Sequence, residues 1–174
     1  QAGSQVLLFD TQPDAAGKAI SAIGSVWDKQ AEKGKLTASE VDACKARLKP
    51  CSALTELAGC DLVVEAIVEK LDTKQGLFKQ LEGIVSPNCA LVTNTSSLSV
   101  TAIAAGMQHP QRFAGYHFFN PVPLMKVVEV IAGLKTDSAV CAQLSSYAKQ
   151  MGHTAVQAAD TPGFIVNHAG RAYG

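Results

Sequence analysis

Short apolar runs alternate along this chain with longer segments of helical periodicity, and this alternation constrains the fold more than any other feature. Six runs read as strands: SQVLLFD (4–10), LVVEA (62–66), NCALVTN (88–94), RFAGYHFF (112–119), KVVEVIAG (126–133) and HTAVQA (153–158). Helical patterns follow the first three runs and separate the last two. Strands that are apolar along their whole length and separated by helices favour a mostly parallel sheet covered on both faces. The sequence therefore predicts an α/β fold with a doubly wound sheet.

A helical hairpin is predicted between the first two strands. The segment TASE (37–40) has the spacing of a capping box, in which Thr37 accepts from the third helical amide and Glu40 reaches back. It starts a second helix over residues 38–48, so that residues from about 13 to 48 form a hairpin projecting from the sheet. The turn between the two helices carries Lys33 and Lys35, which suit an anionic group but are equally typical of a solvated turn.

Composition argues against partners that need strong charge or a long apolar segment. The 15 basic residues balance the 15 acidic ones, so neither nucleic acid nor an anionic membrane is an expected partner. The five cysteines have no CxxC or Cys/His ligand spacing, which predicts no metal site and a reducing compartment. No run approaches the roughly 20 apolar residues of a membrane helix. We expect a cytoplasmic protein, or one of the mitochondrial matrix or peroxisome in a eukaryote.

Two polar segments follow strands at the edge where α/β folds bind ligands. Asp10 ends the first strand, where a carboxylate can accept both hydroxyls of an adenosine ribose; it could equally form a turn or cap a helix. No glycine-rich phosphate loop precedes it. NTSSLS (94–99) follows the third strand and either binds a ligand or caps the next helix.

The segment GYHFFNPVPLMKVVEV (115–130) places His117 in an aromatic stretch and Glu129 in an aliphatic run. Burial penalises charge at such positions, so each group is either a satisfied core polar residue or works on a substrate. Between them the chain can turn through NPVPLM and bring Glu129 back beside His117 on a second strand. This spacing is compatible with either alternative, a satisfied core pair or two groups that act on a substrate.

Taken together, NTSSLS, RFAGYHFFNPVPLMKVVEV and DTPGFIVN (160–167) resemble the L-3-hydroxyacyl-CoA dehydrogenase family of NAD-dependent enzymes in β-oxidation and related acyl-CoA pathways. The segments QVLLFD (5–10) and DLVVEAIVEKLDTKQGLF (61–78) fit the same family in the same order. The resemblance implies a partial Rossmann-type domain with NAD as cofactor. It also implies reversible oxidation of a (3S)-3-hydroxyacyl-CoA to the 3-oxoacyl-CoA.

The resemblance also implies roles for individual residues. His117 would be the general base, with Glu129 orienting its ring. Ser96 would bond the 3-oxygen of the substrate, and Asn167 would hold the reacting acyl group. Contacts to NAD are implied for Asp10, Glu69, Lys74, Ser96 and Asn120, and contacts to the CoA substrate for Lys33 and Ser96.

The chemistry needs these residue types. Oxidation of a secondary alcohol transfers hydride from carbon and releases a proton from oxygen, so it requires a base that titrates near neutrality, which imidazole is. Two other functions remain open: a non-catalytic relative, as among the lens crystallins of this superfamily, and an acyl-CoA or nucleotide-binding module without turnover. The presence of Ser96, His117, Glu129 and Asn167 together favours the enzyme.

The sequence departs from the family in four respects. Val26 stands where some members have a second CoA-contacting serine, and NHAGRAYG (167–174) is atypical after the PGFIVN motif. The family's first βα unit, with the glycine loop, and its C-terminal helical domain are not in these residues. We therefore expect residues 1–174 to form an incomplete NAD-binding domain that is inactive by itself, and the full-length protein to be a homodimer.

Overall fold

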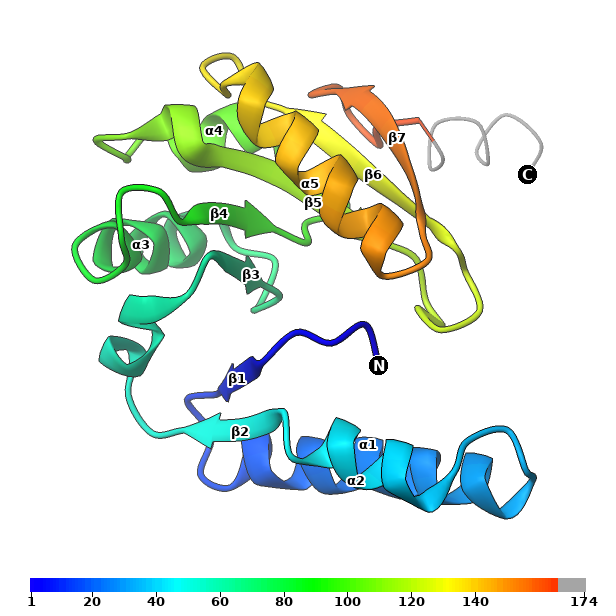
Figure 1. Cartoon of the computed structure of the whole chain (residues 1–174). Helices are drawn as coiled ribbons and strands as arrows, with labels where there is room; N and C mark the ends of the chain where they lie inside the picture. The colour runs from blue at the N-terminus through cyan, green and yellow to red at the C-terminus, as the bar shows by residue number, and fades with distance from the viewer. Residues whose placement is uncertain (166–174) are drawn as a thin grey trace. The chain divides into compact units, whose positions relative to one another are not determined.

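The computed structural model describes residues 1–165 (Figure 1). The chain divides into two compact units, Gln1–Leu57 and Ala58–Gly174, and the boundary falls in the 3-10 helix η1 (Leu54–Gly59). Each unit has its own sheet. The predicted α/β fold with a mostly parallel sheet is confirmed, and no ladder joins the two sheets within residues 1–165.

The first unit pairs two helices with a short parallel sheet. Its elements are β1 (Val6–Phe9), α1 (Ala15–Glu32), α2 (Ala38–Lys45) and β2 (Leu48–Cys51). The predicted capping box is present: the amide of Glu40 donates to the Thr37 hydroxyl at 3.2 Å, and the Thr37 amide donates to Glu40 at 2.7 Å. Lys45 bridges α2 to Asp28 of α1 at 2.7 Å.

The second helix is shorter than predicted, because a turn at residues 46–47 leads into a strand that begins at Leu48. The helix ends at Lys45, and β2 pairs in parallel with β1, Val6 opposite Leu48. The backbone groups of β1 thereby gain partners that a longer helix would not supply. Pro50 is tolerated in β2, because a strand with only one neighbour needs fewer amide donors.

The second unit holds a five-stranded sheet in the order β3-β4-β5-β6-β7. The strands are β3 (Leu62–Glu65), β4 (Ala90–Thr93), β5 (Phe113–Phe118), β6 (Val127–Ala132) and β7 (Thr154–Ala159), and the helices are α3 (Leu71–Glu82), α4 (Val100–Ala104), α5 (Ser138–Gln150) and the 3-10 helix η2 (Pro110–Arg112). All neighbours are parallel except β5 and β6, which form an antiparallel pair. After β7, residues 162–165 form turns.

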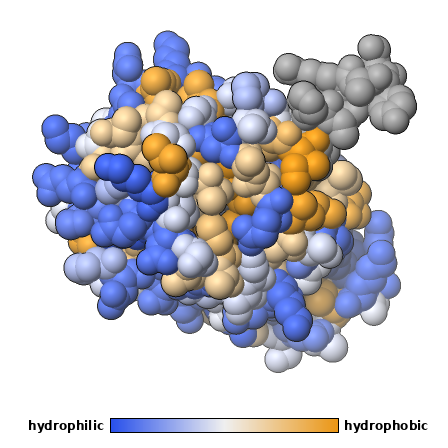
Figure 2. Space-filling view, turned by 90° about the horizontal axis from the view of Figure 1, so that it is seen from above, coloured by the Kyte–Doolittle hydropathy of each residue, from blue (hydrophilic) through white to orange (hydrophobic). Residues whose placement is uncertain are grey.

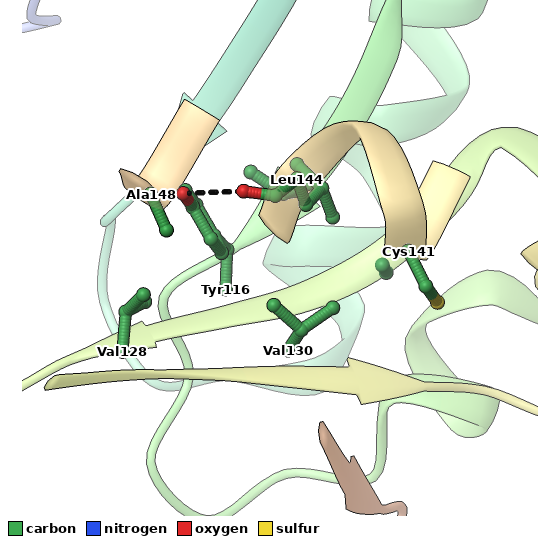
Figure 3. Close-up of a cluster of buried hydrophobic side chains, with 8 residues drawn as sticks. Tyr116, Val128, Val130, Cys141, Leu144 and Ala148 are labelled. Carbon is green, nitrogen blue, oxygen red and sulfur yellow. Dashed lines mark hydrogen bonds between the residues drawn. The ribbon is translucent and has the colours of Figure 1, made fainter. Parts of the chain in front are cut away.

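Helix α5 packs on one face of β5 and β6 through a buried cluster (Figure 3). The cluster contains Val92, Ala114, Tyr116, Val128, Val130, Cys141, Leu144 and Ala148. The phenol of Tyr116 is fully buried and donates to the carbonyl of Leu144 at 3.0 Å, which satisfies its hydroxyl. Successive side chains of a strand point to opposite faces. Tyr116 on the α5 side therefore places His117 on the other face of the sheet.

Some large apolar side chains of this unit remain exposed. Figure 2 shows orange patches among hydrophilic side chains on the face it presents. The exposed residues are Val64, Ile67, Val68, Leu124, Met125, Leu134 and Ile165. They belong to β3 and to several loops, so the exposed apolar area is divided among separate segments. No helix within residues 1–165 has both the length and the apolar character needed to cross a bilayer.

Gly115 allows α4 to approach β5 closely. A Cβ added there would lie 2.9 Å from Val100 Cγ2 and 2.9 Å from Ile131 Cβ. Atoms at that separation overlap, and both neighbours are fully buried. Only glycine therefore fits between α4 and β6 at this position.

We predict that Gly115→Ala destabilises the protein by about 1–3 kcal/mol, the usual cost of overpacking a core. Gly76→Ala is the matched control, because Gly76 is helical and a Cβ there meets nothing within 4 Å. That substitution should stabilise by about 0.5–1 kcal/mol, since alanine loses less backbone entropy. Urea unfolding of both variants measures the two changes in the free energy of unfolding. Equal changes in the two variants would contradict the packing argument.

Candidate active site

The antiparallel pairing of β5 and β6 brings His117 directly opposite Glu129. His117 Nδ1 lies 2.7 Å from Glu129 Oε2, with His117 6% exposed and Glu129 fully buried. A carboxylate only accepts hydrogen bonds, so Nδ1 is the donor in this contact, and Nε2 is the ring nitrogen that does not face Glu129. The second carboxylate oxygen accepts from the amide of Ile165 at 2.9 Å. The two strands thus bring the His117 ring and the Glu129 carboxylate into direct hydrogen-bond contact.

Two phenylalanine rings confine the imidazole. The Phe119 ring centroid lies 4.6 Å from that of His117, and the Phe164 centroid lies 5.7 Å from it. Phe164 is 4% exposed and has a φ of 51°, a conformation that non-glycine residues rarely adopt. These rings and the Glu129 bond restrict rotation of the His117 ring.

The loop that carries Ser96 follows β4 at the same sheet edge where β5 ends. Parallel strands have their carboxyl ends on one edge, and β4 pairs in parallel with β5. The side-chain oxygen of Asn94 accepts from the amide of Phe118 at 2.9 Å, which ties the end of β4 to the residue after His117. Ser96 is exposed at this edge. The structure thus brings the Ser96 loop to the end of the strand that carries His117.

Glu69 anchors the start of the Ser96 loop. Its Oε1 accepts from the amide of Ser96 at 3.2 Å and from the hydroxyl of Ser97 at 3.1 Å, and Thr95 also donates to it. Burial alone would raise the pKa of the Glu69 carboxyl, but hydrogen bonds from Thr95, Lys74 and Ser97 lower this pKa to about 2. The loop therefore rests on a carboxylate that stays charged at neutral pH.

Lys74 lies buried behind Glu69. Its ammonium contacts Glu65 Oε1 at 2.6 Å and Glu69 Oε2 at 3.1 Å, and its side chain is 1% exposed. The other oxygen of Glu65 accepts from the Thr93 hydroxyl at 2.7 Å. A buried ammonium needs such partners. In this position Lys74 acts on the two carboxylates, and its predicted contact with the cofactor stays a prediction.

The remaining predicted residues are exposed or lie outside the described part of the chain. Asp10 follows β1 and accepts from the amide of Gln12 at 2.7 Å, which forms a turn. Lys33 is exposed at the end of α1, and both residues belong to the first unit. Asn120 is exposed in the loop after β5. Asn167 lies outside the described residues.

Sequence reasoning missed Asp160, which follows β7. Its carboxylate accepts from the hydroxyl of Ser99 and from the amides of Val100 and Thr101 at 2.8–2.9 Å. A small pocket of about 80 Å³ lies beside it, lined by Ser97, Ser99, Asp160, Thr161 and Pro162. The signal in the sequence was an aspartate directly after an apolar strand, the same feature that drew attention to Asp10.

Each unit by itself carries groups that suit a nucleotide. In the first unit, the exposed carboxylate of Asp10 follows β1 and can accept from ribose hydroxyls. In the second unit, the hydroxyls of Ser96 and Ser97 follow β4 and can bond ribose hydroxyls or a carboxamide. Residues 1–165 contain no cluster of three His, Cys, Asp or Glu side chains placed to hold a metal ion.

Residues 1–161 match the family described as "3-hydroxyacyl-CoA dehydrogenase, NAD binding domain". The chain belongs to this family. It is 45% identical over 171 residues to 3-hydroxyadipyl-CoA dehydrogenase of Escherichia coli K12, covering 98% of this chain and 36% of that protein. It is 42% identical over 166 residues to a probable 3-hydroxybutyryl-CoA dehydrogenase of Bacillus subtilis, covering 95% and 58%.

Solved members of the dehydrogenase family have the same fold. The crystal structure of 3-hydroxybutyryl-CoA dehydrogenase from E. coli superposes with a TM-score of 0.97 at 45% identity, over 99% of this chain and 36% of that one. The (S)-3-hydroxybutyryl-CoA dehydrogenase of Ralstonia eutropha gives 0.92 at 37% identity, over 96% and 59%. The chain thus spans 36–59% of the length of these relatives.

We predict that the stability contributed by Glu69 falls as pH is lowered from 4.5 towards 2. A carboxyl whose folded pKa lies below its unfolded value stabilises the fold above the unfolded pKa and loses this effect as pH falls through the folded one. The Tm of the unchanged protein should therefore exceed that of Glu69→Gln at pH 6. Thermal unfolding from pH 7 to pH 3 should show this difference shrinking, and a constant difference would contradict the assignment.

Proposed function

We propose that this chain belongs to an enzyme that oxidises (3S)-3-hydroxyacyl-CoA to 3-oxoacyl-CoA with NAD⁺, and catalyses the reverse reduction. The observation that carries the proposal is the His117–Glu129 pair, in which Nδ1 and Oε2 are 2.7 Å apart in a buried setting. Family membership at 45% identity supports the same reaction. The chain spans less than two thirds of its relatives, so the activity is proposed for the whole protein.

Bound NAD⁺ supplies the hydride acceptor. His117 Nε2 takes the proton of the 3-hydroxyl as the carbonyl forms, because Nδ1 is already committed to Glu129. The imidazolium that results is balanced by the Glu129 carboxylate, which avoids an unpaired buried charge. The Ser96 hydroxyl bonds the 3-oxygen and holds it towards His117. Phe119 and Phe164 keep water from the ring.

The other residues in this proposal recognise the ligands. Asp10 bonds the ribose hydroxyls of NAD, and Glu69, Lys74 and Asn120 form the nicotinamide side, with Lys74 acting through Glu69. Lys33 binds the CoA moiety, and Asn167 holds the acyl group. Balanced charge and the resemblance favour a cytoplasmic homodimer that acts on acyl-CoA without nucleic acid or membrane partners.

The experiment is an NADH absorbance assay with acetoacetyl-CoA on the whole protein. Consumption of NADH that depends on acetoacetyl-CoA is the expected result. The alternative is an acyl-CoA or nucleotide-binding module, which would bind NADH in calorimetric titration but give no turnover. That outcome would overturn the proposed reaction.

We predict that His117→Ala lowers kcat by roughly 100-fold or more, the scale expected for loss of a general base. NADH binding should remain, because the imidazole is assigned to the substrate proton. His109→Ala is the control, since His109 is exposed in the turn before η2, and its kcat should stay near that of the unchanged protein. Near-normal turnover of His117→Ala at neutral pH would exclude it as the base.

We predict that Asp10→Ala weakens NADH binding by about 1–3 kcal/mol, through loss of charge-assisted hydrogen bonds to the ribose. The preference for NADH over NADPH should narrow, because the carboxylate disfavours a 2′-phosphate. Calorimetric titration with both cofactors measures the two effects. Unchanged discrimination would show that Asp10 only forms the turn to Gln12.

A further inference from the structure

Asp160 joins two segments that lie about sixty residues apart in the chain. Oδ1 accepts from the amide of Val100 at 2.9 Å, and Oδ2 accepts from the Ser99 hydroxyl and the Thr101 amide, each at 2.8 Å. Burial raises the pKa of this carboxyl, but the bonds from Thr101, Ser99 and Val100 outweigh that effect and lower the pKa. Both oxygens of the Asp160 carboxylate therefore accept hydrogen bonds from the start of α4.

These bonds complete the support of the loop that carries Ser96. Glu69 accepts from three consecutive residues, 95–97, and Asp160 accepts from the next group, 99–101. The two carboxylates come from different parts of the sheet, one after β3 and the other after β7. Ser96 lies between them along the chain. A change at either carboxylate therefore frees one side of this loop.

The segment that begins at Asp160 also reaches the base. The amide of Ile165 donates to Glu129 at 2.9 Å, on the oxygen that His117 does not use. Phe164, one residue earlier, is buried against the His117 ring. The intervening turn is closed by the amide of Phe164, which donates to the Thr161 carbonyl at 3.0 Å. Residues 160–165 are thus held at one end to the Ser96 loop and at the other to Glu129.

We propose that Asp160 is a positioning residue. Through residues 160–165 it fixes the position of the Ser96 loop relative to the His117–Glu129 pair. This inference rests on the proposed function, because Ser96 and His117 act on the same oxygen of the substrate. Asp160 accepts from Ser99, Val100 and Thr101, so it acts on Ser96 through the backbone of the loop and on Glu129 through residues 161–165. A misplacement of about 1 Å between reacting groups can cost 100-fold in rate, while ground-state binding changes less.

The test compares Asp160→Asn with Asp137→Asn in the whole protein. Asp137 also precedes a helix and accepts from an amide at its start, that of Ala139 at 2.9 Å, but it caps α5 rather than the Ser96 loop. In Asp160→Asn we expect kcat with acetoacetyl-CoA and NADH to fall about tenfold and KM to change less than about threefold. Asp137→Asn should lower Tm about as much as Asp160→Asn does, because each loses a helix cap, but its kcat should stay within about twofold of that of the unchanged protein.

Ser99→Ala provides a second, milder variant if Asp160→Asn does not fold. It removes one donor to Asp160 and should lower kcat in the same direction by about threefold, within the range expected for a small misplacement. The proposal would be overturned if folded Asp160→Asn and Ser99→Ala kept a kcat within twofold of that of the unchanged protein. It would also be overturned if Asp137→Asn lost as much kcat as Asp160→Asn.

A second measurement does not depend on turnover. In NMR spectra, Asp160→Asn should shift the ring nitrogens of His117 and the amide of Ile165, and Asp137→Asn should leave them in place. The unchanged protein could lack turnover while Asp160→Asn still shifts these signals. In that case the proposed reaction fails and the positioning role stands. Unchanged His117 and Ile165 signals in Asp160→Asn would overturn the positioning role itself.

Discussion

The hydrogen bond between His117 and Glu129 is the interaction on which the rest of the site depends. Glu129 is fully buried in an apolar strand, where an unpaired carboxylate would be strongly destabilising. It is stabilised by two donors, His117 Nδ1 on one oxygen and the Ile165 amide on the other. This arrangement requires β5 and β6 to be antiparallel, because only a direct hairpin puts these two residues opposite each other after so short a connection.

The faces of β5 then determine what covers it. Tyr116 belongs to the cluster under α5, so His117 and Gly115 share the other face. The close approach of Val100 to Gly115 brings α4 onto that face, and the Ser96 loop leads into α4. Gly115 therefore makes room for α4 on the same face of β5 that carries His117.

Local patterns predicted every strand except β2, and also the contact between His117 and Glu129, but they did not reveal the groups that hold the loops. His117 and Glu129 could be paired from the sequence because only a short hairpin separates them. Asp160 bonds residues about sixty positions earlier, and Glu65 bonds Lys74 and Thr93 across separate elements, so no local pattern reveals their partners. Strand β2 was missed for a similar reason. Lys49 and Pro50 break its apolar pattern, and its strand conformation comes from pairing with β1.

The two kinds of assigned residue differ in how firmly they are held, and the chemistry explains the difference. The proton transfer proposed for His117 requires closely placed atoms. His117 lies on a buried strand, and its ring contacts Glu129 and two aromatic rings. Recognition of a ribose or a CoA phosphate by charge tolerates longer and more variable distances. The residues assigned to it, Asp10 and Lys33, are accordingly exposed at the ends of elements. The role proposed for Ser96 combines both requirements, because its side chain would have to be exposed to the substrate and its backbone fixed relative to His117. The carboxylates of Glu69 and Asp160 meet that combined demand, because they hold the backbone around Ser96 and leave its side chain at the surface.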